Sequence, residues 1–195
     1  MTFANGLRAI LRQDPDIISV GEIRDGETAG IAMRSAITGH LVMSTLHTND
    51  AISAVYRLRD IGVEPWLVAS ALRGVISQRL VRKICPHCKT AYQPSEEELA
   101  LLGMPEDSHV TFYKGEGCPE CHHSGYTGRR AAFEILMLSG RLRRLISEGA
   151  NEEQLTEEAR KNGFRSMRES CRRLVLEGVT SAEEAARIIN TTVDE

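Results

Sequence analysis

The segment DIISVGEIRD (residues 16–25) has the pattern of a buried β-strand that ends at an acidic side chain. Apolar or small residues run from Ile17 to Val20, and Gly21 and Glu22 follow where a parallel strand would leave its sheet. In an open α/β sheet, ligands bind beyond the carboxyl ends of the strands. A carboxylate there can orient a water molecule and help to hold magnesium. Glu22 is therefore a candidate catalytic residue, although a strand ending in Gly-Glu is also a common structural feature.

A second strand is predicted at LVMSTL (41–46), and HTND (47–50) follows it directly. If the two strands are neighbours, His47 and Glu22 face the same crevice, where an imidazole can sense or stabilise a phosphate because it titrates near neutral pH. His40 precedes the same strand, and at about 3.3 Å per residue it lies roughly 23 Å from His47. Geometry therefore favours His47 at the site and leaves His40 as a structural or interface residue. The alternative for His47 is an ordinary turn residue.

Helical patterns alternate with these strands in the first 84 residues. The expected helices are 3–13, one capped by Asp25 or Thr28 and ending at Thr38, one capped by Asn49 or Asp50 and ending at Asp60, and one opened by Pro65. Alternation of strands and helices indicates an α/β fold with a parallel sheet.

Residues 85–128 differ in character, because they contain two Cys-x-x-Cys pairs and many turn residues. Two such pairs folded together form a closed tetrahedral Cys₄ site, the structural zinc type. The expected ligands are Cys85, Cys88, Cys118 and Cys121. A redox role for one pair is the alternative. Three histidines could each replace a thiolate: His87, His122 and His123.

The C-terminal third has a strand pattern followed by helical patterns. Residues 129–138 are expected to form a strand that returns to the main sheet, with a small helix at 95–102 before it. Residues 139–190 are expected to form three or four helices with breaks at Gly149, Gly163 and Gly178. The arginines of 141–148 and 160–173 fit either solvated helix faces or contacts with a neighbouring subunit or with partner proteins.

Composition narrows the class of protein. The formal net charge is −3 and no segment is strongly basic, which argues against nucleic-acid binding. The apolar runs are too short to span a membrane, and the first residues lack a signal-peptide pattern. The default expectation is a cytoplasmic protein.

Longer strings of sequence carry a family resemblance. LRQDPDIISVGEIRD (11–25) and TGHLVMSTLHTNDA (38–51) closely resemble the Walker B and histidine boxes of the ATPases of type II secretion and type IV pilus assembly, the general secretory pathway protein E family. QRLVRKICPHCK (78–89) and GCPECHHSGYTGRR (117–130) extend the resemblance.

The resemblance implies roles for particular residues. Glu22 matches the Walker B glutamate, and His40 and His47 match the two histidines of the histidine box. Glu22 and His47 are the expected catalytic residues, and the supporting residues of the two boxes are Gly21, Arg24, Asp25, His40 and Thr48. It further implies a RecA-like fold, use of Mg and ATP, and a hexameric ring at the cytoplasmic face of the inner membrane. Such rings act on inner-membrane platform and anchoring proteins.

One element of this family is missing from the sequence. The phosphate-binding loop G-x-x-x-x-G-K-[ST] is absent, since no glycine is followed directly by a lysine and a Ser or Thr. The expectation is therefore a partial RecA-like P-loop NTPase sheet (1–84), a zinc-binding insert (85–128) and a return strand with a helical region (129–195). Such a C-terminal portion should be inactive alone. The alternative is a free-standing zinc module that binds other proteins.

Overall fold

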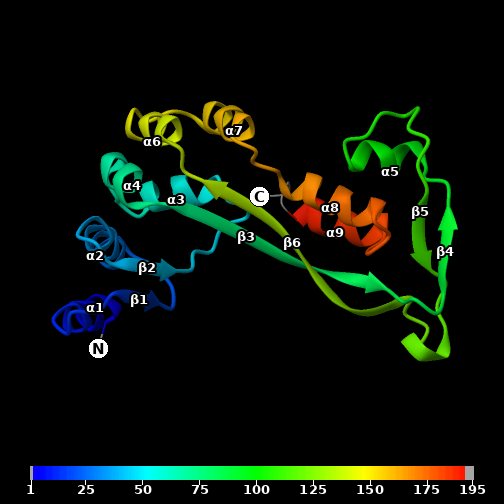
Figure 1. The fold of residues 1–195 in the computed structure, drawn as a ribbon, viewed down its shortest axis with the longest axis horizontal. Coiled ribbons are helices and arrows are strands. Elements are labelled where there is room, and N and C mark those ends of the chain that lie inside the picture. Colours follow the sequence, from blue (N-terminus) through cyan, green and yellow to red (C-terminus); the bar gives the residue numbers. More distant parts are fainter. Residues whose placement is uncertain (1, 192–195) are drawn as a thin grey trace. The chain divides into compact units, whose positions relative to one another are not determined.

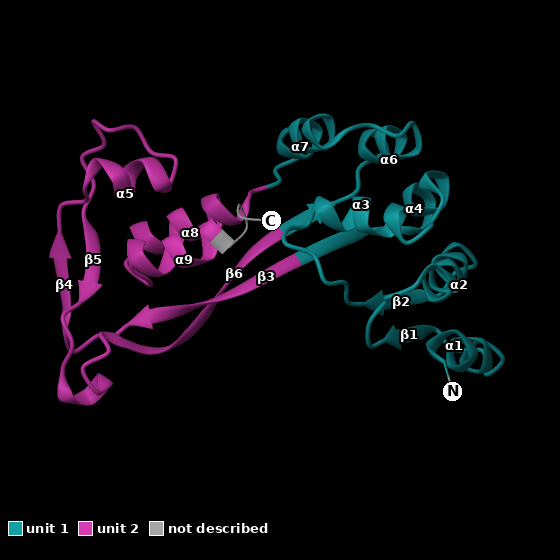
Figure 2. Ribbon diagram, turned by 180° about the vertical axis from the view of Figure 1, so that it is seen from behind, with its two compact units in different colours: residues 1–76, 135–164 teal, residues 77–134, 165–195 magenta. Residues whose placement is uncertain are grey.

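A computed structural model describes residues 2–191. They fall into two compact units, one of residues 2–76 and 135–164, the other of residues 77–134 and 165–191 (Figure 2). The sequence prediction of an α/β fold is confirmed. The division at residues 84 and 128 into an ATPase portion, an insert and a C-terminal region stays a prediction.

The first unit alternates helices and strands from α1 to α3 and is completed by further helices (Figure 1). Its elements are α1 (Phe3–Leu11), β1 (Ile17–Val20), α2 (Gly26–Ile37), β2 (Leu41–Ser44), α3 (Ser53–Asp60), α4 (Pro65–Ala71), α6 (Gly140–Ser147) and α7 (Glu152–Lys161). β1 and β2 are parallel, with Ile17 opposite Leu41 and Val20 opposite Ser44. Because parallel strands end at the same edge, the segments after Val20 and Ser44 leave the sheet side by side.

The second unit contains a small antiparallel sheet and a helix pair. Its elements are β4 (Lys89–Tyr92), α5 (Glu96–Leu101), β5 (Phe112–Gly115), a 3₁₀ turn (Pro119–Cys121), α8 (Met167–Leu176) and α9 (Ala182–Thr191). Two long strands, β3 (Gly74–Ile84) and β6 (Tyr126–Met137), pair with each other and contribute residues to both units. The strand predicted at 129–138 is thus present, but it pairs with β3 and not with the β1–β2 sheet.

Helix boundaries follow local capping chemistry. Asp25 caps α2 by accepting a hydrogen bond from the Thr28 amide at 2.8 Å, and Pro65 occupies the first turn of α4. Asp50 accepts bonds from the amides of Ile52 and Ser53 at 2.8 and 2.7 Å. This turn delays the start of α3 to Ser53, three residues beyond the predicted cap at Asp50.

Three of the C-terminal helices end where the sequence predicted. Gly149, Gly163 and Gly178 follow α6, α7 and α8, each with a positive φ. Glycine adopts this conformation without the steric penalty of a β-carbon, so it ends a helix readily.

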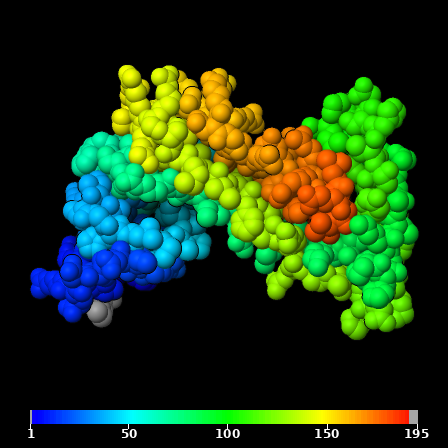
Figure 3. All heavy atoms as spheres, in the orientation of Figure 1, coloured from blue at the N-terminus to red at the C-terminus, as the bar shows by residue number. Residues whose placement is uncertain are grey.

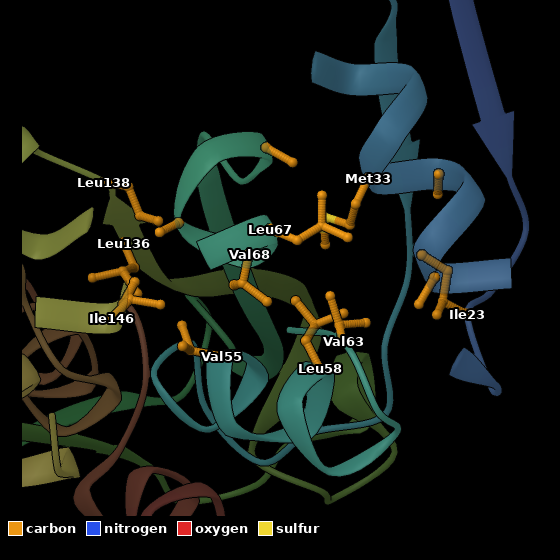
Figure 4. Close-up of a cluster of buried hydrophobic side chains, with 14 of the residues drawn as sticks. Ile23, Met33, Val55, Leu58, Val63, Leu67, Val68, Leu136, Leu138 and Ile146 are labelled. Carbon is orange, nitrogen blue, oxygen red and sulfur yellow. The ribbon is translucent and has the colours of Figure 1, made fainter. Parts of the chain in front are cut away.

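The core of the first unit lies around α4. Figure 4 shows Val68 of α4 directed toward Val55 of α3, and Leu67 beside Met33 of α2. Leu136, from the end of β6, belongs to the same cluster. The cluster packs the helices that flank β1 and β2 and so supports the strand ends. Within residues 2–191, no helix combines the length and apolar character needed to cross a bilayer.

The core of the second unit joins the helix pair to β5. Its cluster includes Phe112 of β5, Leu174 and Val175 of α8, and Ile189 of α9. Two carboxylates are buried beside it and both have partners: Glu134 accepts a bond from the Met167 amide at 2.7 Å, and Glu184 binds Arg82.

Candidate functional site

The site at the strand ends is built around Glu22. Its Oε1 accepts a hydrogen bond from the Arg24 guanidinium at 2.7 Å, and its Oε2 lies 3.2 Å from Nε2 of His47. The Glu22 side chain is 21% exposed, whereas Arg24 and His47 are 70% and 84% exposed. The structure therefore brings the two predicted catalytic residues into direct contact at one edge of the sheet.

The electrostatics of the site keep Glu22 ionised. The hydrogen bond from Arg24 lowers the pKa of Glu22, and this outweighs the desolvation that raises it; His47 lowers it further. An ionised carboxylate accepts hydrogen bonds only, so Glu22 can hold and polarise a water molecule at neutral pH.

Thr45 fixes the distance between the two strand-end segments. Its hydroxyl donates to the carbonyl of Gly21 at 2.7 Å, and its own carbonyl accepts from the Ile23 amide at 3.1 Å. These two bonds bracket Glu22 and hold it opposite His47. The sequence analysis did not identify Thr45. The one feature that could have pointed to it is that a polar, β-branched residue stands near the end of a predicted strand.

The other residues of the two boxes have structural partners. Asp25 accepts bonds from the backbone and side chain of Thr28, and these bonds lower the pKa of Asp25. Thr48 donates to the Asp50 carbonyl at 3.1 Å. His40 lies directly before β2, and its Nδ1 is 3.0 Å from the carbonyl oxygen of Ser35 in α2. β2 therefore separates His40 from His47, as the sequence predicted.

The four predicted cysteines form a second cluster. Their Sγ atoms all lie within 4.8 Å of one another, and Cys118 and Cys121 are 3.7 Å apart, Cys85 and Cys118 3.9 Å, and Cys88 and Cys121 3.9 Å. Cys85 and Cys121 are buried, and Cys88 and Cys118 are half-buried. A tetrahedral zinc ion with Zn–S bonds of about 2.3 Å separates its sulfur atoms by about 3.8 Å, so the cluster has the dimensions of a metal site.

Backbone amides surround the thiols. Gly117 N donates to Cys88 Sγ at 3.3 Å, and Cys118 N and Gly125 N donate to Cys121 Sγ at 3.2 and 3.3 Å. Burial raises the pKa of Cys121, yet the amide bonds, together with the contacts to Cys118 and Cys88, outweigh burial and lower it to about 6. Burial dominates at two other thiols of the cluster, raising the pKa of Cys88 to about 12 and raising that of Cys118. Amide donors of this kind favour thiolates, the form that binds metal.

Glycine is required at residue 117, beside the cluster. Gly117 has φ +90°, and a β-carbon there would lie 2.8 Å from the carbonyl oxygen of His123. The chain can therefore pass close to the second Cys-x-x-Cys turn only without a side chain at residue 117.

Known proteins resemble this chain over nearly its whole length. Residues 1–187 match the family model of type II/IV secretion system proteins. The chain is 52% identical over 188 residues to type II secretion system protein E of Pseudomonas aeruginosa, covering 96% of this chain and 37% of that protein. It is 50% identical over 186 residues to the type IV pilus assembly ATPase PilB of Thermus thermophilus, covering 94% of this chain and 21% of that protein.

Solved structures confirm the fold. The pilus retraction motor PilT with bound ADP superposes with a TM-score of 0.66 at 31% identity, over 96% of this chain and 43% of that one. The likeness to such motors makes the fold RecA-like. The chain thus spans less than half the length of these relatives. On the extent of the family match and the level of identity, this chain belongs to the type II/IV secretion system protein family.

Proposed function

We propose that this chain is the C-terminal part of a secretion or pilus-assembly ATPase and supplies the water-orienting half of its catalytic site. The contact between Glu22 and His47 at 3.2 Å carries the proposal, because it joins two distant parts of the sequence at the edge where α/β sheets bind ligands. Relatives named as type II secretion and type IV pilus ATPases support the assignment.

The phosphate-binding half comes from another segment of a longer protein. The sequence has no phosphate-binding loop. In the described part of the chain, one face of the β1–β2 sheet is left exposed. Ile17, Leu41 and Met43 are 59%, 53% and 51% exposed. Parallel sheets are normally covered on both faces, so these apolar side chains favour a covering layer from elsewhere in the ATPase.

The residues of this chain have distinct tasks in the proposed mechanism. Glu22 accepts a hydrogen bond from the attacking water and orients it, and its negative charge strengthens that bond. Arg24 keeps Glu22 ionised, and His47 stabilises or senses the γ-phosphate. Magnesium, held with the aid of Glu22, would neutralise charge on the transferred phosphoryl group. Thr45 positions Glu22 through the backbone.

The family supports a proposal for the wider setting. We propose that the complete protein forms a hexameric ring in the cytoplasm, peripheral to the inner membrane. It would couple ATP hydrolysis to pilus or pseudopilus assembly through inner-membrane platform and anchoring proteins. Nothing in the charge of the chain favours nucleic acid as a partner.

The cysteine cluster is proposed to hold one structural zinc ion. Cys85, Cys88, Cys118 and Cys121 provide four soft ligands at tetrahedral spacing, and such a set leaves no open position for chemistry. A redox role is disfavoured because each thiol has close neighbours in both pairs.

Calorimetric titration with Mg-ATP tests the proposed division of the site. The 195-residue chain should bind weakly or not at all, because most phosphate-binding groups belong to the missing loop. A full-length ATPase that includes this sequence is the positive control and should bind. Micromolar affinity for the 195-residue chain alone would mean that the site has been misplaced.

A further inference from the structure

The turn between α8 and α9, residues 177–181, is held by segments that adjoin the metal-site cysteines. Ile84, directly before Cys85, donates its amide to the carbonyl of Val179 at 2.9 Å. Lys89, directly after Cys88, donates from Nζ to the carbonyl of Gly178 at 2.7 Å. Both flanks of the first Cys-x-x-Cys pair therefore bind the same turn.

The second pair reaches this turn through Tyr126. Gly125 donates its amide to Cys121 Sγ at 3.3 Å and accepts a bond from the Cys85 amide at 2.9 Å. The hydroxyl of the next residue, Tyr126, lies 2.6 Å from Ser181 Oγ. Each cysteine pair thus has a neighbour that contacts residues 178–181.

Close packing makes these contacts sensitive to position. Gly178 has φ +64°, and a β-carbon there would lie 2.5 Å from Lys89 Nζ and 2.8 Å from the Tyr113 ring. Lys89 Nζ also lies 4.2 Å from the centre of that ring. In Figure 3 the orange and red atoms of α8 and α9 lie against green atoms of the segment that contains β4 and β5, and α8 and α9 both contact β5.

The start of α9 is anchored to β3, just before the first cysteine. Thr180 donates its hydroxyl to the Arg82 carbonyl at 2.8 Å. The carboxylate of Glu184 accepts bonds from the backbone amide and the guanidinium of Arg82, and it is only 7% exposed. The Arg82 guanidinium lies 4.1 Å from the centre of the Tyr126 ring, so β3, β6 and α9 meet there.

We propose that occupancy of the cysteine site by metal controls the stability of the α8–α9 turn, although this turn supplies no ligand. The inference rests on the proposed zinc site. Metal binding fixes the two Cys-x-x-Cys turns relative to each other, because no disulfide joins the four free thiols. Without metal, the two Cys-x-x-Cys turns are no longer fixed relative to each other. The positions of Ile84, Lys89 and Tyr126 then become less defined, and their contacts with the α8–α9 turn weaken together.

Hydrogen exchange of the 195-residue chain, with zinc and after chelation, tests the coupling. The reporter amides are Gly178 and Val179, which donate to the carbonyls of Val175 and Leu174 at 2.9 Å. Chelation should accelerate their exchange about tenfold or more, the size expected for losing a charge-assisted hydrogen bond. The internal control is the α6–α7 turn of the other unit, where Gly149 and Ala150 donate to Ile146 and Leu145. Their exchange should not change.

A matched pair of lysine variants separates the coupling from general loosening. Lys89→Met should accelerate exchange at Gly178 with zinc still bound and weaken zinc affinity by about tenfold, as loss of a residue beside a ligand commonly does. Lys114→Met removes an exposed lysine from the same small sheet and should do neither.

The outcomes distinguish two failures. If metal analysis finds no zinc on protein purified without chelator, the proposed zinc site fails and the coupling fails with it. If zinc binds and leaves on chelation but exchange at Gly178 and Val179 stays the same, the zinc site stands and the coupling is overturned. Zinc-dependent protection of these amides that Lys89→Met reduces supports the coupling.

Discussion

The Glu22 carboxylate has both oxygens engaged, one by Arg24 and the other by His47. The two partners differ in chemistry. The hydrogen bond from the Arg24 guanidinium is the main influence that lowers the pKa of Glu22, and the contact with His47 lowers it by less. Glu22 is therefore a permanent negative charge at neutral pH, as a water-orienting residue requires.

The two histidines should differ in their effect on hydrolysis. In a full-length ATPase that includes this sequence, His47→Ala should slow steady-state ATP turnover, by up to about 100-fold, because it removes a group that stabilises the γ-phosphate. His40→Ala should change turnover little, since β2 separates His40 from Glu22 and its ring bonds to the Ser35 carbonyl. Equal damage from both variants, with the ring intact, would place the site elsewhere.

Individual residues were predictable where one local rule determined them. Asp25 was predicted as a cap and does cap α2, because a carboxylate before a helix satisfies its free amides. Glu22 and His47 could be paired because parallel strands end at one edge. Thr45 was missed because its role depends on a bond to Gly21, which is 24 residues away in the sequence.

Among the elements, the cysteine-rich segment is the one whose stability should depend on metal. β4 begins directly after Cys88, and its partner β5 ends at Gly115, three residues before Cys118. Hydrophobic packing in this region comes from Leu99, Leu102 and Phe112, which join the core of the second unit. The two Cys-x-x-Cys turns contain few apolar side chains, so we expect their stability to depend on metal bound by the thiols.

Replacing one ligand should loosen this segment selectively. The wild-type chain should contain one zinc ion, and Cys88→Ser should lose most of it, because a hydroxyl is a poor zinc ligand beside three thiolates. Exchange of amides in residues 85–128 should then accelerate more than exchange in β1 and β2. Metal analysis and hydrogen exchange on the same samples provide the measurement. Free thiols with no zinc in the intact wild-type fold would contradict the expectation.

Strand pairing marks the limit of prediction at the scale of elements. The strand at 129–138 was predicted from its composition, but its partner was not. β6 pairs with β3, although the cysteine-rich segment separates the two strands in the sequence. A pairing between strands so far apart in the sequence leaves no signal in local periodicity. The helices after it were predicted correctly because Gly149, Gly163 and Gly178 mark their ends.

At the scale of the whole molecule, the chain matches 37% of the length of its P. aeruginosa relative and contains one half of a proposed catalytic site. The β1–β2 sheet exposes Ile17, Leu41 and Met43 on one face, and its edge carries Glu22 and His47 with no phosphate-binding loop in the sequence. Both features are explained by one proposal, that another segment of a longer ATPase covers the sheet and binds the phosphates.

The role of Glu22 in that longer protein is the central claim. Glu22→Gln keeps the shape of the side chain and removes the charge that orients water. Nucleotide affinity should stay within about tenfold of wild type, because it comes mainly from the phosphate loop and magnesium. Turnover should fall far more, since positioning and electrostatics account for most of phosphoryl-transfer catalysis.

The most direct test is the steady-state ATPase rate of full-length Glu22→Gln protein, measured beside equilibrium nucleotide binding on the same preparation. The account predicts a loss of turnover of at least about 100-fold with nucleotide still bound at near wild-type affinity. Turnover within a few-fold of wild type, in a variant that folds and binds nucleotide normally, would contradict it.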